Sequence, residues 1–109
     1  ANEYFSSRQY EKAAGMYEQL LAFSPGDAEI YNNLGLTLHY LGRSTEALGR
    51  LNEGVAVDPE HQRIWLTLGY VNSQVGNIEQ AGTALTTAVR IGTDESIRQS
   101  ATKMLEGLP

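Results

Sequence analysis

The sequence predicts an all-α fold, a right-handed superhelix of about three helix-turn-helix repeats followed by a C-terminal capping helix. Three observations predict it. The chain matches itself at an offset of 34 residues, for example from Tyr31 to Trp65, a period typical of stacked helical repeats. Apolar residues in each copy follow the helical period twice, with a break between the two stretches. The 109 residues, 41% hydrophobic and 19% charged, are typical of a single globular domain, 1–109.

The first repeat, residues 1–27, is partial. Shifted back by one period, Ala13, Tyr17 and Leu21 fill the slots of the second helix of a pair, and Pro25 closes the copy. Only part of a leading helix precedes them, so the copy is truncated at its start. We expect a chain that opens inside a repeat to be a fragment of a longer protein.

The second repeat, residues 28–61, contains two apolar stripes that Gly42-Arg43-Ser44 separates. Their members recur at helical spacing: Ile30, Leu34, Leu38 and Leu41 in the first, and Ala47, Leu48, Leu51 and Val55 in the second. Gly42 suits the left-handed residue that closes a helix, and Ser44 is expected to cap the next helix. At the end of the repeat we expect Asp58 to act as a cap and Pro59 to occupy the first position of the following helix.

The third repeat, residues 62–93, has the same two-stripe pattern around a break at Gly76-Asn77. Its apolar positions are Ile64, Trp65, Leu68, Val71 and Val75 before the break, and Ile78, Ala81, Leu85, Ala88 and Val89 after it. Gly76 again suits a helix end. Asn77, with Gln80 three residues later, has the form of a capping box for the second helix.

Residues 94–109 leave the repeat register but keep a helical stripe. It consists of Ile97, Ala101, Met104, Leu105 and Leu108. We predict a C-terminal capping helix that covers the last pair with this stripe and turns its polar side to water. The alternative is that the stripe is exposed and docks a partner or a second copy of the chain.

At these positions the chain resembles the tetratricopeptide repeat family. The matching residues are Tyr31, Leu34, Gly35, Ala47, Leu51, Gly54 and Pro59 in the second copy, and Trp65, Leu68, Gly69, Ala81, Leu85 and Ala88 in the third. Thr93 departs from the closing Pro of the pattern. Gly35 and Gly69 recur where a side chain would hold two antiparallel helices apart, so the residues themselves predict tight helix pairs. Ala47 and Ala81 offer the small facing surface that lets the helices close.

The composition argues against catalysis, nucleic acid and membranes as functions. The chain has no cysteine, and His39 and His61 lack the i, i+4 spacing with which two imidazoles share a metal. We expect no metal, no cofactor and no enzyme. A net charge of −5 without a basic cluster disfavours nucleic acid. No apolar run reaches the roughly 20 residues of a membrane span, so we expect a soluble chain without membrane insertion, and no targeting segment assigns it a compartment.

The family resemblance implies that the first helix of each pair lines an inner, concave face. The candidate residues for a partner-binding groove on that face are Asn2, Phe5, Asn33, Leu36, His39, Tyr40, Arg63, Leu66, Tyr70 and Gln74. Aromatic and aliphatic anchors among hydrogen-bonding groups are typical of peptide recognition. The alternative reading is that the leucines and tyrosines of this set complete the packing between repeats.

Some members of the family hold a partner's C-terminal carboxylate with a clamp of Asn and basic residues. Here Asn2, Asn33 and Arg63 fall on three slots of that clamp, whereas Thr67 stands where a second basic residue is expected. The sequence therefore predicts a protein-interaction module, an adaptor or assembly factor that binds a protein or peptide partner. The alternative function is self-association into homo-oligomers through the open ends of the superhelix or the C-terminal helix.

Overall fold

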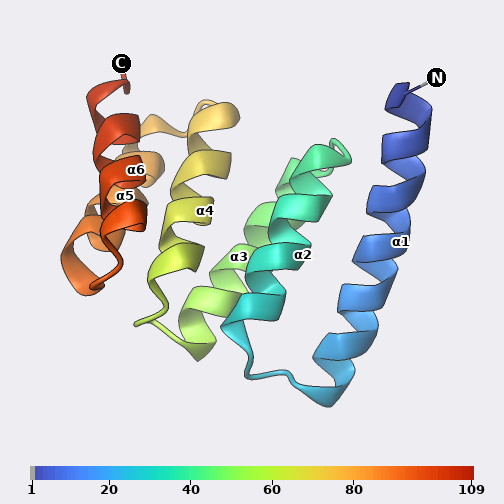
Figure 1. The fold of residues 1–109 in the computed structure, drawn as a ribbon. Coiled ribbons are helices and arrows are strands. Elements are labelled where there is room, and N and C mark those ends of the chain that lie inside the picture. Colours follow the sequence, from blue (N-terminus) through green and yellow to red (C-terminus); the bar gives the residue numbers. More distant parts are fainter. Residues whose placement is uncertain (1) are drawn as a thin grey trace.

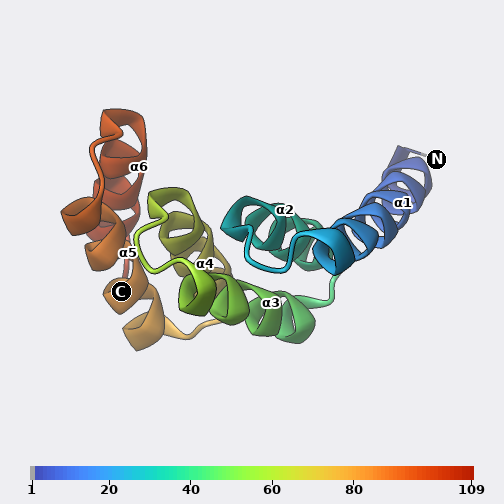
Figure 2. The same cartoon turned by 90° about the horizontal axis from the view of Figure 1, so that it is seen from below.

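The computed structural model describes residues 2–109, with side chains from Ser7 onward. Its regular elements are helices throughout this part of the chain: α1 (Asn2–Phe23), α2 (Ala28–Tyr40), α3 (Ser44–Val57), α4 (Gln62–Gln74), α5 (Ile78–Ile91) and α6 (Glu95–Glu106). Helices α2 and α3 form one pair, α4 and α5 form the next, and the elements follow one another side by side (Figure 1). Seen from below they describe an arc, with α2 and α4 on its inner side and α3 on its outer side (Figure 2). The predicted all-α repeat fold is confirmed.

Two glycines end the first helices of the pairs, as predicted. Gly42 and Gly76 have φ angles of +80° and +87°, a region that glycine enters without steric cost. After each of them the chain turns back, so that the N–H of Arg43 donates to the Leu38 carbonyl and that of Asn77 to the Asn72 carbonyl, both at 2.9 Å. This pattern satisfies carbonyls that a helix end leaves free.

The predicted caps of the second helices are wrong. Neither α3 nor α5 has a side-chain hydrogen bond at its N-cap. The Ser44 hydroxyl lies 2.9 Å from Nδ1 of His39, and Asn77 donates through Nδ2 to Oδ1 of Asn72 at 3.1 Å. Both side chains therefore turn back to the preceding helix, where a polar partner is within reach, instead of to their own helix.

The start of α4 also differs from the prediction. The helix begins at Gln62, and its cap is His61, whose Nδ1 accepts a hydrogen bond from the Ile64 N–H at 3.2 Å. Asp58 instead accepts from the Glu60 N–H within the connecting turn, and Pro59 lies in that turn. The other ring nitrogen of His61 contacts Oε2 of Glu29 on α2 at 2.8 Å. One imidazole thus caps a helix and ties two repeats together.

Small residues set the distance between the helices of each pair. A Cβ atom on Gly35 would lie 2.5 Å from the Leu51 side chain, and one on Gly69 would lie 2.5 Å from Leu85. Real Cβ atoms do not approach a neighbouring side chain so closely. Helices α2 and α4 can therefore pack this closely against α3 and α5 only because glycine stands at the crossing point. Ala47 and Ala81, on the facing helices, are fully buried, which confirms the prediction of tight pairs.

The pairs stack through a continuous core. One cluster contains Leu34, Leu51 and Ile64 and runs from α1 to α5, and a second contains Leu85, Ile97 and Ala101 at the C-terminal end. Trp65 packs against both clusters. Each pair therefore buries apolar surface of the next, as in repeat proteins whose units are stabilised by their neighbours.

The first repeat differs from its expected form. Helix α1 runs without a break from Asn2 to Phe23, so no separate leading helix precedes the slots of Ala13, Tyr17 and Leu21. The slot of Gly42 and Gly76 falls on Arg8, and no residue other than glycine has a positive φ in the described chain. The left-handed turn that divides the other two copies is therefore missing, and the helix continues.

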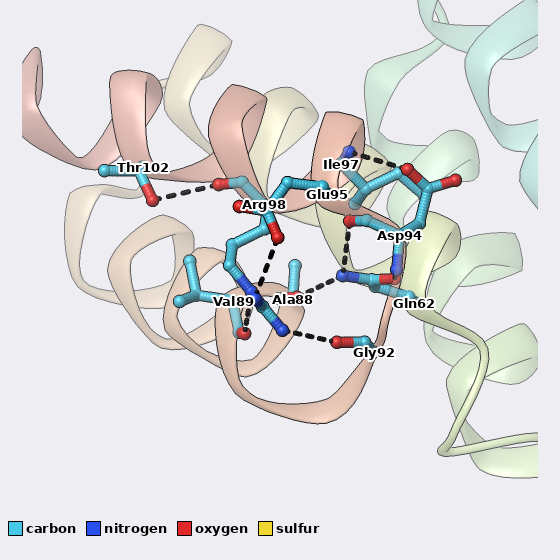
Figure 3. A network of polar contacts seen from close by, with 9 residues as sticks. All are labelled: Gln62, Ala88, Val89, Gly92, Asp94, Glu95, Ile97, Arg98 and Thr102. Carbon is cyan, nitrogen blue, oxygen red and sulfur yellow. Dashed lines mark hydrogen bonds and ion pairs between the residues drawn. The ribbon is translucent and has the colours of Figure 1, made fainter.

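Helix α6 packs with its apolar stripe against α5 and α4, as the capping prediction requires. A polar network ties it to α4 (Figure 3). The buried Gln62 amide donates to the carbonyls of Ala88 and Asp94, at 2.9 and 3.3 Å, and accepts from the Asp94 N–H at 3.1 Å. Arg98 donates to the carbonyls of Val89 and Gly92. Two side chains thus satisfy carbonyls at the C-terminal end of α5. No helix among residues 2–109 combines the length and apolar character needed to span a membrane.

Candidate functional site

The predicted groove residues lie on the two inner helices and differ in exposure. On α2, Asn33, Leu36 and His39 are half-buried and Tyr40 is 48% exposed. On α4, the half-buried residues are Leu66 and Tyr70, and the exposed ones are Arg63 and Gln74. The predicted side chains of Asn2 and Phe5 lie outside the residues whose side chains are described. Leu66 packs against the C-terminal core formed by α5 and α6, so this member of the set contributes to packing.

Aromatic rings from three helices meet on the inner side. The ring centroids of Tyr40 and Tyr10 are 5.5 Å apart, those of His39 and Tyr40 are 5.8 Å apart, and those of His39 and Tyr70 are 5.6 Å apart in an edge-on arrangement. These distances are within the range of favourable aromatic pairs. We call Tyr10, His39, Tyr40 and Tyr70 the aromatic cluster. It joins α1, α2 and α4 into one surface.

The surroundings of Tyr40 favour the neutral form of its phenol. Partial burial raises the pKa of the Tyr40 phenol above its ordinary value, and the neighbouring phenols of Tyr70 and Tyr10 and a hydrogen bond with Tyr70 raise it further. His39 is fixed from the other side by its contact with Ser44. The cluster therefore presents ring faces and polar edges in a set orientation.

A hollow of about 390 Å³ adjoins the cluster at Tyr70. It is lined by Tyr70, Ser73, Gln74, Ile78, Met104, Gly107, Leu108 and Pro109. Apolar side chains from α4, α5 and the C-terminal segment thus stand beside the hydroxyl of Ser73 and the amide of Gln74. Such a mixture suits an apolar side chain of a polypeptide whose backbone still needs hydrogen-bond partners.

Sequence reasoning missed two features of this surface. Tyr10 falls on the slot of Ser44 and Ile78, at the start of a second helix, so the repeat register gave no reason to place it with the inner residues. The contribution of Met104 and Leu108 was also missed, because both were assigned only to the stripe that covers α5. The sequence offers no local signal for either, since both depend on how the elements stack.

A second hollow, of about 500 Å³, lies elsewhere, over α4 between α3 and α5. Its lining includes Trp65 and Leu68 together with the amides of Asn52, Asn72 and Gln80. Trp65 is held there by a hydrogen bond from Nε1 to the Pro59 carbonyl at 2.8 Å. This hollow is larger than the inner one but contains none of the aromatic cluster, and we favour the inner face because several anchors converge there.

Among the predicted groove residues with described side chains, Arg63 is the one that carries a permanent charge. Among the residues with described side chains, no three His, Cys, Asp or Glu residues come together as they would around a metal ion. Arg63 is exposed on the first turn of α4, and the Asn33 side chain accepts a hydrogen bond from Asn32 at 3.3 Å. The arrangement can therefore offer aromatic surface, amides and one guanidinium to a ligand.

Comparisons with known proteins give a consistent result. A family model for the TPR repeat matches residues 1–42, and one for the tetratricopeptide repeat matches residues 37–96. The mouse protein DnaJ homolog subfamily C member 7 is 33% identical over 76 residues, which are 70% of this chain and 15% of the relative. The matched part of this chain thus spans about a seventh of the length of that relative.

Solved structures share the fold at lower sequence identity. PcrH in complex with the chaperone binding region of PopD superposes with a TM-score of 0.82 at 21% identity, over 94% of this chain and 80% of that one. The Sgt2 TPR domain from Aspergillus fumigatus gives a TM-score of 0.74 at 20% identity, over 96% and 74% of the two chains. At these identities the likeness concerns the fold.

Proposed function

Because this chain belongs to the tetratricopeptide repeat family, we propose that it is a protein-interaction module that binds a peptide or helix of a partner protein on its concave face. Its role would be that of an adaptor or assembly factor. The observation that carries the proposal is the aromatic cluster, in which four rings from three helices meet on the inner side and Tyr40 remains 48% exposed. Rigid aromatic anchors in such positions dominate the binding energy of many interfaces.

The two ends of the groove offer different groups to a ligand. Tyr40 and Tyr10 offer ring faces at the α1 side, while the hollow beside Tyr70 offers room for an apolar side chain at the α6 side. Gln74 and Ser73 can bind the main chain of the ligand between them. A partner segment would therefore lie across α2 and α4, with apolar residues spaced to reach both ends.

The similar proteins support the same reading. PcrH, which shares the fold, was solved in complex with the chaperone binding region of PopD, and the DnaJ homolog matches 70% of this chain. The family and the groove give no reason to assign catalysis, so we propose a binding module and no enzyme. The carboxylate clamp remains a narrower prediction, which Arg63→Ala and a peptide with an amidated C-terminus would test together.

The experiment that tests the function places a photo-activatable phenylalanine at position 40 or 70, with position 86 as a control. Thr86 is exposed on α5 and lies outside the groove. We expect covalent capture of one defined partner segment from positions 40 and 70 and not from position 86. That segment, made as a peptide, should lose at least about 30-fold in affinity for the Tyr40→Ala and Tyr70→Ala variants, the effect of an anchor worth about 2 kcal/mol. Equal capture from position 86, or unchanged affinity of both variants, would refute the proposal.

A further inference from the structure

Helix α1 carries more apolar surface than the neighbouring helix α2 covers. Among the described helices it packs side by side only with α2, against which Ala14 and Leu21 are buried. A further tie, to α3, is the ion pair between Glu18 and Arg50, at 2.6 Å. On an adjoining face, Met16, Leu20 and Phe23 are 52%, 42% and 87% exposed. Their spacing of four and three residues puts them on one side of the helix. We call these three residues the α1 outer stripe.

The other repeats show what covers the equivalent face. One and two periods after Leu20 stand Gly54 and Ala88, and both are buried. Ala47 and Ala81, one and two periods after Ala13, are fully buried, whereas Ala13 is only half-buried. Helices α3 and α5 each pack against two helices, and the additional one is the first helix of their own pair. Leu20 lies on the face of α1 that such a helix would cover. Met16 and Phe23 flank that face, on the slots of Arg50 and Val57, which stay partly exposed in the second repeat.

We propose that the α1 outer stripe docks an amphipathic helix of a partner protein, and that this helix has a glycine or alanine where it crosses Tyr17. In the two complete pairs the residue at this slot is Leu51 or Leu85, and each lies against a glycine of the first helix, where an added Cβ would be 2.5 Å away. Tyr17 fills the same slot with a larger, half-buried side chain. A helix that crosses α1 at the same point needs a small residue there.

The size of the surface favours a single helix over a second copy of this chain. Three partly exposed side chains offer on the order of 300 Å² of apolar surface, whereas a stable dimer buries about 800 Å² on each partner. The stripe is also continuous with the α1–α2 interface through Tyr17, which packs at the edge of the main core. A docked helix would extend an existing core and would not need to form a new one.

This surface is separate from the proposed groove. The aromatic cluster uses Tyr10 of α1, and the outer stripe uses three other residues of the same helix. The two sites can therefore be tested independently, and one can fail without the other.

The probe is a labelled peptide with the sequence of residues 28–43 of this chain, because that segment makes the required glycine contact with α3 in the protein itself. Binding to the intact chain is followed by fluorescence anisotropy. We expect binding that Leu20→Glu weakens at least tenfold, and that Gly35→Leu in the peptide abolishes. Val75→Glu, at a side chain 42% exposed at the C-cap of α4, is the matched control and should leave binding unchanged. Tyr40→Ala should also leave it unchanged, which separates this site from the groove.

A second variant guards against misfolding. Phe23→Ser alters a side chain that is 87% exposed, so the melting curve should stay the same while peptide binding falls. Absence of peptide binding, or binding that both Leu20→Glu and Phe23→Ser leave intact, overturns the proposal. Sedimentation velocity of the chain alone tests whether a second copy occupies the stripe. If the chain forms a dimer and Leu20→Glu dissociates it, a second copy is the occupant and the proposal of a partner helix is overturned.

Discussion

Replacing Gln62 by Ala should destabilise the C-terminal third of the fold. Gln62 is 8% exposed, and its amide bonds the Ala88 carbonyl and both main-chain polar groups of Asp94. Ala88 is fully buried, so its carbonyl loses a partner that water cannot easily replace, at a cost of about 1–3 kcal/mol. Asp94 is exposed, and water can replace part of its two bonds, which leaves roughly 1 kcal/mol there. We expect a total loss of about 2–4 kcal/mol, and a melting temperature lower by about 10 °C or more.

Chemical denaturation followed by circular dichroism measures this loss, with Gln80→Ala as the matched control. Gln80 is exposed on α5 and has the same side chain, so its replacement should change the unfolding free energy by less than about 0.5 kcal/mol. Gly92→Ala adds a second test, because a Cβ there would overlap the Gln62 amide. The Gly92→Ala penalty should shrink in the Gln62→Ala background. If Gln62→Ala costs no more than Gln80→Ala, the network does not hold α6 in place and the reasoning is refuted.

The other predictions concern substitutions at four single residues. Gly35→Ala should destabilise the fold by about 1–3 kcal/mol, because the added Cβ would overlap Leu51. Gly49→Ala, with open space around the added Cβ, should stabilise the fold by up to about 1 kcal/mol. Denaturation midpoints that shift in opposite directions would check both. Asn32→Leu should stabilise by about 1 kcal/mol, because the buried Asn32 Oδ1 has no hydrogen-bond partner among the described residues, and an unchanged or lower midpoint would contradict this. The Tyr40 pKa is raised in the folded state. The stability that the neutral phenol contributes is therefore present below the unfolded pKa of about 10 and is lost as pH rises through the folded pKa. Tyr40→Phe should remove that loss of stability at alkaline pH in melting curves recorded against pH.

The sequence predicted the stacking better than the ends of the helices. Gly35 and Leu51 recur one period later as Gly69 and Leu85, and recurrence alone identified the crossing points of the pairs. The caps failed because Ser44 and Asn77 each had two possible partners, and the choice depends on how close the previous helix lies. Local propensity describes only one of those partners.

For the candidate site, too, the repeat period predicted positions in the fold but not the contacts between side chains. The repeat register placed His39, Tyr40 and Tyr70 on the inner helices, but it could not foresee that their rings meet or that Tyr10 completes the cluster. Those contacts depend on the curvature of the arc and on the unbroken course of α1. Residues that no repeat supplies, such as Met104 and Leu108 beside the hollow, were beyond any argument from periodicity.

The residue types at the groove positions differ from one repeat to the next, whereas those at the helix-crossing positions are kept. One period after Leu36, His39 and Tyr40 stand Tyr70, Ser73 and Gln74. Because the frame repeats and these side chains do not, the α1 end of the groove is aromatic and the α6 end pairs an amide with an apolar hollow. A ligand shifted by one repeat would place its apolar residues against the wrong groups and lose both sets of contacts. A partner segment should therefore bind in one direction and one register, and reversing its sequence should abolish binding even though its composition is unchanged.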